Sequence, residues 1–143
     1  MDIIIGSDHA GFDLKEDIKR FLSKKGNYIV KDMGAFSDDP VDYPIIAHQV
    51  AKNIAENKFS RGVLICGSGI GMSIVANRYR NVRAALCHDL YTVRLSRKHN
   101  DANILVLGGR VLGLDLALRM VDLFLSTDFE GGRHQRRLEE IDT

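Results

Sequence analysis

The sequence predicts a doubly wound, Rossmann-like α/β fold, in which a five-stranded parallel sheet carries helices on both faces. Short apolar segments alternate along the chain with segments of helical period, which is the pattern of successive β-α units. The apolar segments run without polar interruptions, as strands covered on both faces do. The chain has 143 residues, of which 45% are hydrophobic and 27% charged. This composition suits one globular domain spanning residues 1–143.

The first half of the chain is expected to form three strands and two helices. The strands are the apolar or β-branched runs at 2–7, 28–30 and 62–66. Gly26 and Asn27 are typical of a helix end and separate the first helix from the second strand. The expected inner faces of the two helices are Leu14, Ile18, Phe21 and Leu22, and then Ala47, Val50, Ala51 and Ile54.

The second half continues the alternation. Helices are expected at 72–77, 89–97 and 113–125, and strands at 82–86 and 104–107. A C-terminal helical segment follows the last of these helices. The sequence shows no internal repeat and no linker rich in Pro or Ser, so nothing marks a second domain.

The helix expected at 113–125 is apolar around almost all of its circumference. Its charged residues, Asp115, Arg119 and Asp122, share one narrow stripe. The remaining apolar surface is more than one sheet face can cover, so we expect part of it to be buried against another chain. The protein is therefore predicted to form a homodimer or a higher oligomer such as a tetramer. The alternative is a helix covered by the C-terminal segment of its own chain.

Charge and hydropathy exclude several classes of protein. With 20 basic and 19 acidic residues the formal net charge is +1, which argues against nucleic acid as the main partner. No signal-like segment and no apolar stretch of membrane-spanning length is present, so we expect a cytoplasmic protein without a membrane partner. The two cysteines, Cys66 and Cys87, form no disulfide framework.

A glycine-rich loop, residues 67–71, joins the third strand to the next helix. Backbone N–H groups and the positive end of a helix dipole are available there to hold an anion. The dinucleotide-binding pattern fails because Met72 stands where a glycine or alanine is required. The Walker and nucleophile-elbow patterns fail as well. We therefore expect an anion-binding loop, the alternative being a tight turn that lets the helix approach the strand.

Cys66 ends the third strand immediately before this loop. N–H groups beside a thiol favour its thiolate form, which can serve as a base or nucleophile. A buried cysteine is also common as a small apolar core residue, and this alternative stays open at the level of the sequence. For Cys87, at the end of the fourth strand, the core interpretation is preferred.

Among the five histidines, His9 and His99 stand next to strand ends, and imidazoles there are suited to carry protons near neutral pH. No two histidines have local metal-ligand spacing, so no metal site is expected. Near the C-terminus, Arg133 and Arg137 stand four residues apart. Two guanidinium groups on one helical face suit a phosphate, and a solvated helix balanced by neighbouring acidic residues is the alternative.

Five segments together resemble the type-B ribose-5-phosphate isomerases, a family that also contains the galactose-6-phosphate isomerase subunits. They occur in the same order and span nearly the whole chain. These segments are 6–11, 42–44, 66–71, 96–103 and 130–134.

The resemblance implies the aldose–ketose isomerisation of ribose 5-phosphate and ribulose 5-phosphate, a step of the pentose phosphate pathway, through an enediolate and without metal or organic cofactor. Cys66 matches the family's proton acceptor and His99 the acid that opens the furanose ring. The substrate-binding positions that it implies are Asp8, His9, Gly67, Ser68, Gly69, Ile70, Gly71, Asn100, Arg110, Arg133 and Arg137. The family's sites are built between two subunits, so the resemblance also implies an active site at a subunit interface.

Some family members carry a glutamate base at the position of Met72, so this chain resembles the cysteine type. Two other functions remain open. One is isomerisation of a six-carbon phosphosugar such as allose or galactose 6-phosphate, and the other is a non-catalytic nucleotide- or flavin-binding module. A phosphorylated receiver domain is excluded because Cys66 stands where such a domain has an acidic residue.

Overall fold

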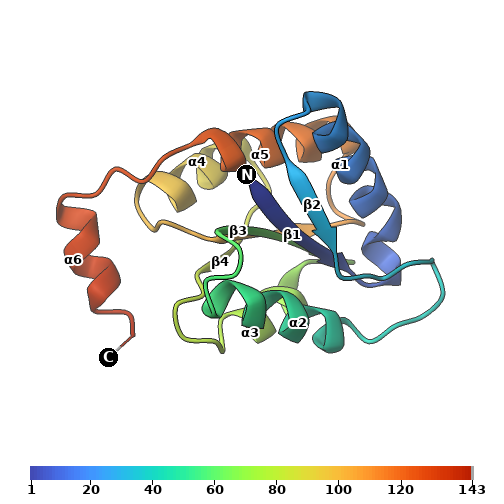
Figure 1. Ribbon diagram of the computed structural model, residues 1–143, viewed down its shortest axis with the longest axis horizontal. Helices are drawn as coiled ribbons and strands as arrows, with labels where there is room; N and C mark the ends of the chain where they lie inside the picture. The colour runs from blue at the N-terminus through green and yellow to red at the C-terminus, as the bar shows by residue number, and fades with distance from the viewer. Residues whose placement is uncertain (143) are drawn as a thin grey trace.

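The computed structural model describes residues 1–142 and contains a five-stranded sheet (Figure 1). The order across the sheet is β2-β1-β3-β5-β4, and all four pairings are parallel. The predicted fold class is confirmed, and each strand lies within two residues of its expected bounds. The strands are β1 (Asp2–Ser7), β2 (Ile29–Asp32), β3 (Arg61–Cys66), β4 (Ala84–Leu86) and β5 (Ile104–Gly108).

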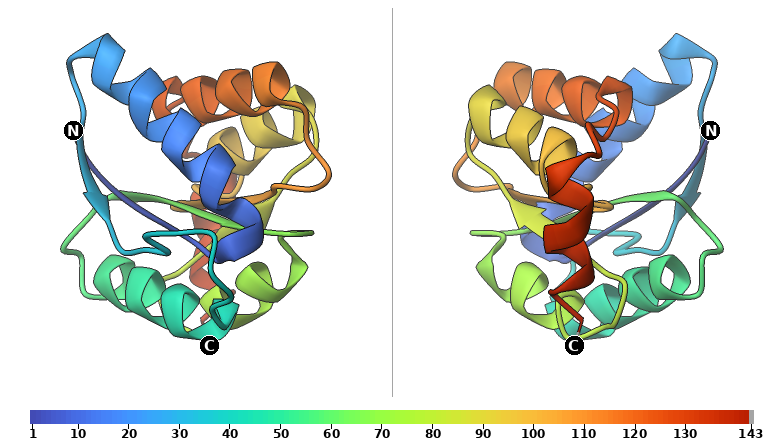
Figure 2. Two further views of the ribbon diagram at one scale, coloured as in Figure 1. Left: turned by 90° about the vertical axis from the view of Figure 1, so that its right-hand side faces the viewer. Right: turned by 90° about the vertical axis from the view of Figure 1, so that its left-hand side faces the viewer.

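The helices form two layers around the sheet. Figures 1 and 2 show α2 and α3 on one face, α1, α4 and α5 on the other, and α6 standing apart at one end of the sheet. A short 3-10 turn, η1 (His9–Gly11), precedes α1. The α-helices are α1 (Phe12–Lys25), α2 (Tyr43–Ala55), α3 (Ile70–Ala76), α4 (Leu90–Lys98), α5 (Leu114–Ser126) and α6 (Arg133–Glu139).

Successive residues of the central strands face opposite layers. In β1, Ile3 and Ile5 pack into the core beneath α1, α4 and α5, whereas Ile4 packs into the core beneath α2 and α3. In β3, Val63 and Leu64 divide in the same way. Both faces of these strands are therefore covered, which explains why their apolar runs are continuous.

The apolar surface of α5 is covered mainly within the chain. The sheet, α1 and α4 bury one side of it. The leucines on its other side are partly buried against the same core, and Leu114 is 48% exposed. The C-terminal helix lies elsewhere (Figure 1), so α1 and α4 cover α5 in place of the C-terminal segment. The predicted interface along α5 stays a prediction. Within residues 1–142 no helix combines the length and the apolar content needed to span a bilayer.

A buried arginine anchors the segment that leads to α6. The guanidinium of Arg97 is 1% exposed, and it donates hydrogen bonds to the carbonyl oxygens of Thr127 and Ala102 at 3.0 and 2.6 Å and to a carboxylate oxygen of Asp101 at 2.8 Å. The N–H of Glu130 also donates to the carbonyl of Lys98 at 3.1 Å. These bonds hold the start of the C-terminal segment against the end of α4.

A buried lysine ties α1 to the end of β2. The ammonium of Lys15 is fully buried and lies 2.6 Å from a carboxylate oxygen of Asp32, which also accepts a hydrogen bond from Lys19 at 2.7 Å. Burial disfavours the charged form of Asp32, but the hydrogen bonds from Lys15 and Lys19 outweigh it and lower its pKa. The ionised pair is therefore part of the folded structure at neutral pH.

We expect Asp32→Asn to lower the free energy of unfolding by about 3 kcal/mol at pH 7, because it leaves the buried ammonium of Lys15 short of its main counter-charge. Urea denaturation measures the loss. A carboxylate with a lowered pKa contributes stability above its unfolded pKa and loses it as the pH falls through the folded pKa. The difference between the two proteins should therefore shrink below about pH 4.

The matched control is Asp17→Asn, which removes a carboxylate paired with Arg20 on the solvent-accessible side of the same helix. Pairs in solvent contribute about 0–1 kcal/mol. Equal losses from the two substitutions would contradict the role given to the buried pair.

Candidate active site

A pocket of about 670 Å³ opens at the carboxyl edge of the sheet, where β1, β3 and β5 end side by side. Its volume lies in the usual range for small-molecule sites. Open α/β sheets bind ligands at this edge. The residues that line the pocket are Asp8, Tyr43, Cys66, Gly67, Ser68, Ile70, Gly71, Ile74, Arg110 and Val111.

Cys66 and the glycine loop meet at the floor of this pocket. The Cys66 side chain is 5% exposed, and its Sγ accepts a hydrogen bond from the N–H of Gly69 at 3.2 Å. Gly69 has a φ of +82°, and a Cβ there would lie 2.5 Å from Leu86 and 3.1 Å from the backbone of Leu107. Only glycine therefore lets the loop turn into α3 with its N–H directed at the thiol.

The loop also provides a hydroxyl and close contact with an aromatic ring. The Ser68 hydroxyl accepts a hydrogen bond from the N–H of Ile70 at 3.2 Å and remains exposed to the pocket. A Cβ on Gly71 would lie 2.5 Å from the ring of Tyr43, so glycine allows this tyrosine to pack against the loop. Tyr43 was not among the predicted site residues, although it lies within the 42–44 segment of the resemblance.

Asp8 and His9 follow β1 at the same edge. Asp8 is buried, and its carboxylate accepts a hydrogen bond from the N–H of Gly11 at 3.1 Å. The Nδ1 of His9 accepts a hydrogen bond from the N–H of Val41 at 3.2 Å, which places the proton of a neutral ring on Nε2. The ring of His9 is thus held by the loop that precedes α2.

Arg110 lies beside the glycine loop after β5. Its backbone N–H donates to the carbonyl of Gly67 at 3.0 Å, and its side chain is exposed at the mouth of the pocket. The structure thus brings nine of the thirteen predicted site residues to one edge of the sheet. We call this set the cysteine half-site: Asp8, His9, Cys66, Gly67, Ser68, Gly69, Ile70, Gly71 and Arg110.

His99 and Asn100 lie at the opposite, amino edge of the sheet. The carbonyl of Asn100 accepts a hydrogen bond at 3.0 Å from the side chain of Arg83, which precedes β4, and the short loop from Asn100 leads into the start of β5. At about 3.3 Å per residue, β3 separates the two edges by about 16 Å. A single chain therefore does not bring His99 to Cys66.

Arg133 and Arg137 are on α6, which Figure 1 shows beyond the amino edge. Both arginines are exposed. The ring of His134, on the same helix, stacks on His99 with 4.2 Å between ring centroids. We call His99, Asn100, Arg133 and Arg137 the histidine half-site.

His134 also belongs to a cluster that local spacing does not reveal. His99, Glu130 and His134 have potential ligand atoms within 4.8 Å of one another. Burial, together with neighbouring His99 and Arg133, lowers the pKa of His134 and favours its neutral ring. His99 lies more than 30 positions before Glu130 and His134, so spacing within one helix or turn does not reveal this group.

The core interpretation of Cys87 is confirmed. Its side chain is 3% exposed within the core beneath α1, α4 and α5, and burial raises its pKa. Asp89 accepts a hydrogen bond from the N–H of Thr92 at 2.7 Å and caps α4. Both residues follow β4, but Cys87 packs in the core and Asp89 caps a helix, so their roles are structural.

Comparison with known proteins identifies relatives over nearly the full chain. A family model described as Ribose/Galactose Isomerase matches residues 3–141. Ribose-5-phosphate isomerase B of Escherichia coli is 46% identical over 139 residues, covering 97% of this chain and 93% of the relative. A crystal structure of a ribose 5-phosphate isomerase from Thermotoga maritima is 54% identical and superposes with a TM-score of 0.95, covering 99% of this chain and 97% of the other.

A more distant relative has a different name. The D-erythrulose-4-phosphate isomerase of Pectobacterium atrosepticum is 41% identical over 145 residues, covering 99% of this chain and 93% of the relative. All these matches place the chain among the isomerases. It belongs to the Ribose/Galactose Isomerase family, which confirms the resemblance drawn from its motifs.

Proposed function

We propose that the protein interconverts ribose 5-phosphate and ribulose 5-phosphate through an enediolate, with Cys66 as the base. The observation that carries this proposal is the Cys66 thiol held 3.2 Å from the N–H of Gly69 inside a pocket of about 670 Å³. A base and hydrogen-bond donors for an oxyanion are the two groups that an aldose–ketose isomerase requires. The names of the E. coli and T. maritima relatives support the choice of sugar.

The proposed chemistry is a proton transfer between neighbouring carbons. The Cys66 thiolate removes the proton from C2 of the open-chain aldose, the freed electron pair forms the C1–C2 double bond, and the carbonyl electrons move to O1. The thiol then returns the proton to C1 while the O2 proton passes to O1, which gives the ketose. No atom or electron is gained or lost, so the step needs no redox partner.

The glycine loop would stabilise the negative charge that develops on O1. The N–H groups of Gly69 and Ile70 donate to the Cys66 thiol and the Ser68 hydroxyl. The donors proposed for O1 are therefore the exposed Ser68 hydroxyl and the N–H groups that follow in the first turn of α3, which have no partner within the helix. Donors fixed by the fold act without reorganising, and the loss of one typically costs about 10²–10³ in rate. The loop is thus the electrostatic part of the proposed site.

The remaining groups are proposed to come from a second copy of the chain. Opening the furanose ring requires an acid, and a dianionic phosphate requires cations, but His99, Arg133 and Arg137 lie at the far edge of their own sheet. In a homodimer, the histidine half-site of one subunit would face the cysteine half-site of the other. Arg110 would then bind the phosphate together with the two arginines of the partner.

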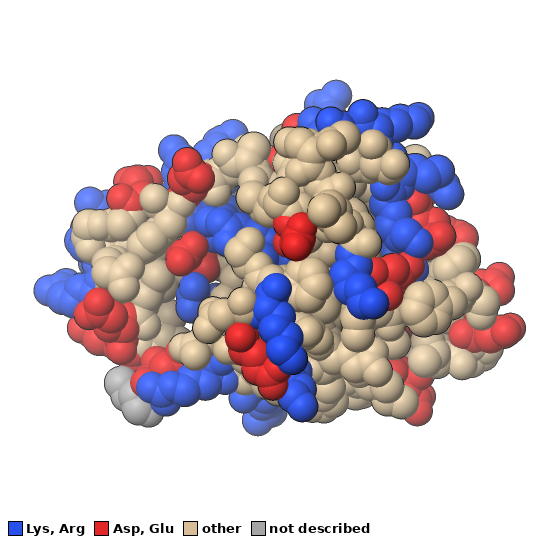
Figure 3. Space-filling model, in the orientation of Figure 1, with Lys and Arg blue, Asp and Glu red and all other residues tan. Residues whose placement is uncertain are grey.

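Two surface features support such a dimer. Ile70 and Ile74 on α3 are 54% and 53% exposed at the rim of the Cys66 pocket, where an apolar partner would cover them. Near the histidine half-site, a groove of about 440 Å³ separates the C-terminal segment from the body of the molecule, and Asn100 and Ile141 are among its lining residues. Figure 3 shows a hollow between α6 and the body on a face where basic and acidic groups are interspersed.

A coupled assay with added EDTA tests the function directly. We expect kcat/KM to be highest for ribose 5-phosphate among the phosphosugars compared, and we expect EDTA to leave turnover unchanged. Preference for another sugar would refute the substrate assignment. Absence of turnover with any phosphosugar would refute the proposed function. A cytoplasmic location stays a prediction.

A second candidate substrate is D-erythrulose 4-phosphate, because the P. atrosepticum relative carries that name at 41% identity. The family description also names galactose, so a six-carbon galactose phosphate is a third candidate substrate. The three sugars place the phosphate at different distances from C1. The assay should therefore include all three at matched concentrations.

We expect Arg137→Ala to raise KM by about 10–100-fold with a smaller change in kcat, because a charge-assisted hydrogen bond to a phosphate contributes about 1.5–3 kcal/mol. Steady-state kinetics with ribose 5-phosphate measures both constants. Arg136→Ala is the matched control, since Arg136 is an exposed arginine on the same helix outside the predicted site. Similar KM values for the two variants would argue against phosphate binding by Arg137.

A further inference from the structure

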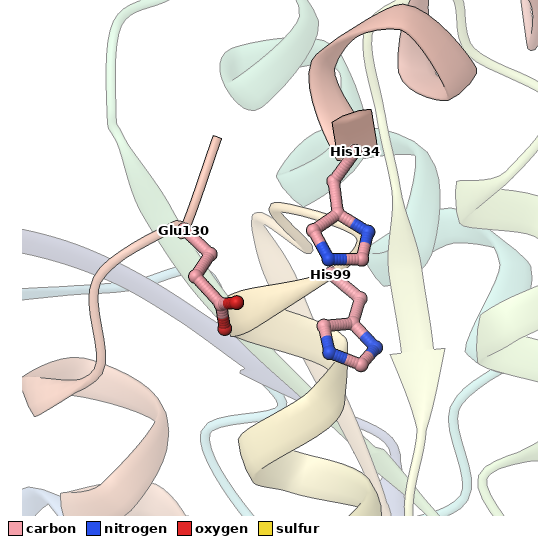
Figure 4. Close-up of side chains that lie close together, drawn as sticks. All are labelled: His99, Glu130 and His134. Carbon is pink, nitrogen blue, oxygen red and sulfur yellow. The ribbon is translucent and has the colours of Figure 1, made fainter. Parts of the chain in front are cut away.

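Three potential metal ligands meet where α4 and α6 approach each other (Figure 4). His99 follows the last residue of α4, His134 lies in the first turn of α6, and Glu130 lies in the segment between the helices. The hydrogen bond from the N–H of Glu130 to the carbonyl of Lys98 holds this segment beside α4. One ligand atom of each residue lies within 4.8 Å of the other two.

The two imidazoles each present one nitrogen on the same side of the stacked pair. Their rings stack at 4.2 Å with 13° between planes. Figure 4 shows that one nitrogen of each ring lies on the side of the Glu130 carboxylate. Because the ring planes are nearly parallel, metal binding requires the rings to turn until the lone pairs of these nitrogens point at one ion.

His134 has a buried nitrogen without a partner. The side chain is 5% exposed, and its Nε2 is buried and forms no hydrogen bond within the described residues. Buried polar atoms are nearly always satisfied, so such an atom calls for an explanation. A ligand at this position would supply the missing interaction.

We propose that His99, Glu130 and His134 bind a divalent transition-metal ion of the zinc type. Two imidazoles and one carboxylate form the ligand set of many zinc sites with an open fourth position. Imidazole also selects zinc, cobalt or nickel over magnesium and calcium. Arg133 and Arg137 lie on the same helix and oppose a cation, so the affinity is lower than that of a structural zinc site.

Metal binding has a consequence for catalysis that rests on the proposed function. An imidazole bound to a metal cannot serve as the acid that opens the sugar ring. The ion is therefore an inhibitor of isomerisation, and EDTA reverses its effect. This consequence is separate from the binding itself, which requires no activity of the enzyme.

Titration of the metal-free protein with Co²⁺ tests the site, because visible absorption reports both binding and the kind of ligand. We expect saturable binding of one ion per chain and competition by Zn²⁺. His134→Gln and Glu130→Gln should each weaken binding by at least about tenfold, since even the loss of an outer-shell partner costs 10–100-fold.

Two control variants make the result specific. His48 lies on α2 and contacts Tyr79. The His48→Gln variant should therefore bind Co²⁺ like the unaltered protein. Cys87→Ala should do the same, because the thiol of Cys87 is buried in the core beneath α1, α4 and α5. Absence of saturable binding, equal weakening of binding in His48→Gln, or wild-type affinity in Glu130→Gln would overturn the proposal. Glu130 is exposed, so this last variant remains informative if His134→Gln does not fold.

Discussion

Cys66→Ala should lower kcat for ribose 5-phosphate isomerisation by about 10²–10⁴-fold, the range that a positioned base contributes. KM should change little, because the proposed binding groups are the glycine loop and the arginines. The same variant should lose the exchange of the C2 proton with solvent deuterium, which NMR detects without a coupling enzyme. Thermal stabilisation by the substrate should persist, since binding does not require the thiol.

The control for this prediction is Cys87→Ala. Cys87 is the other cysteine of the chain and is 3% exposed in the opposite core layer. Its loss should lower the unfolding temperature while kcat stays close to that of the unaltered protein. A Cys66→Ala enzyme with kcat within tenfold of the unaltered one would exclude Cys66 as the base.

The sheet and the cysteine half-site could be predicted because they depend on local patterns and one general rule. Continuous apolar runs such as the one ending at Cys66 define buried parallel strands. In a parallel sheet the carboxyl ends of neighbouring strands share one edge. Asp8, the glycine loop and Arg110 each follow a strand, so their positions in the sequence already place them together.

The position of α6 in the histidine half-site could not be derived from the same patterns. His99 precedes β5, so the same rule assigns it to the amino edge, but the position of α6 depends on tertiary bonds such as that from Arg97 to the carbonyl of Thr127. The family resemblance identified the residues of the histidine half-site, but it did not show where the fold places them. Only the fold shows that Cys66 and His99 of one chain are held apart by the length of β3.

Contacts between distant segments were missed for a similar reason. Helical spacing reveals neighbours three or four residues apart, whereas His99 and His134 meet through the packing of two helices. Tyr43 meets Gly71 because α2 and α3 cover the same face of the sheet. The cover of α5 by α1 and α4 likewise depends on which face of the sheet each helix occupies.

We propose that each active site combines the cysteine half-site of one subunit with the histidine half-site of another. Cys66→Ala and His99→Ala each damage a different half of every site, so each homodimer should be inactive. A heterodimer of the two variants contains one site with both lesions and one site with neither. Equal mixing gives half heterodimers, so about a quarter of the unaltered activity per chain should return.

The measurement is therefore the isomerase activity of the two variants, co-expressed with different affinity tags and purified through both, beside each variant alone. We expect about half of the unaltered activity per dimer in the doubly purified protein and almost none in the parents. Activity in the heterodimer no greater than in the two parents would show that the two half-sites do not combine across subunits.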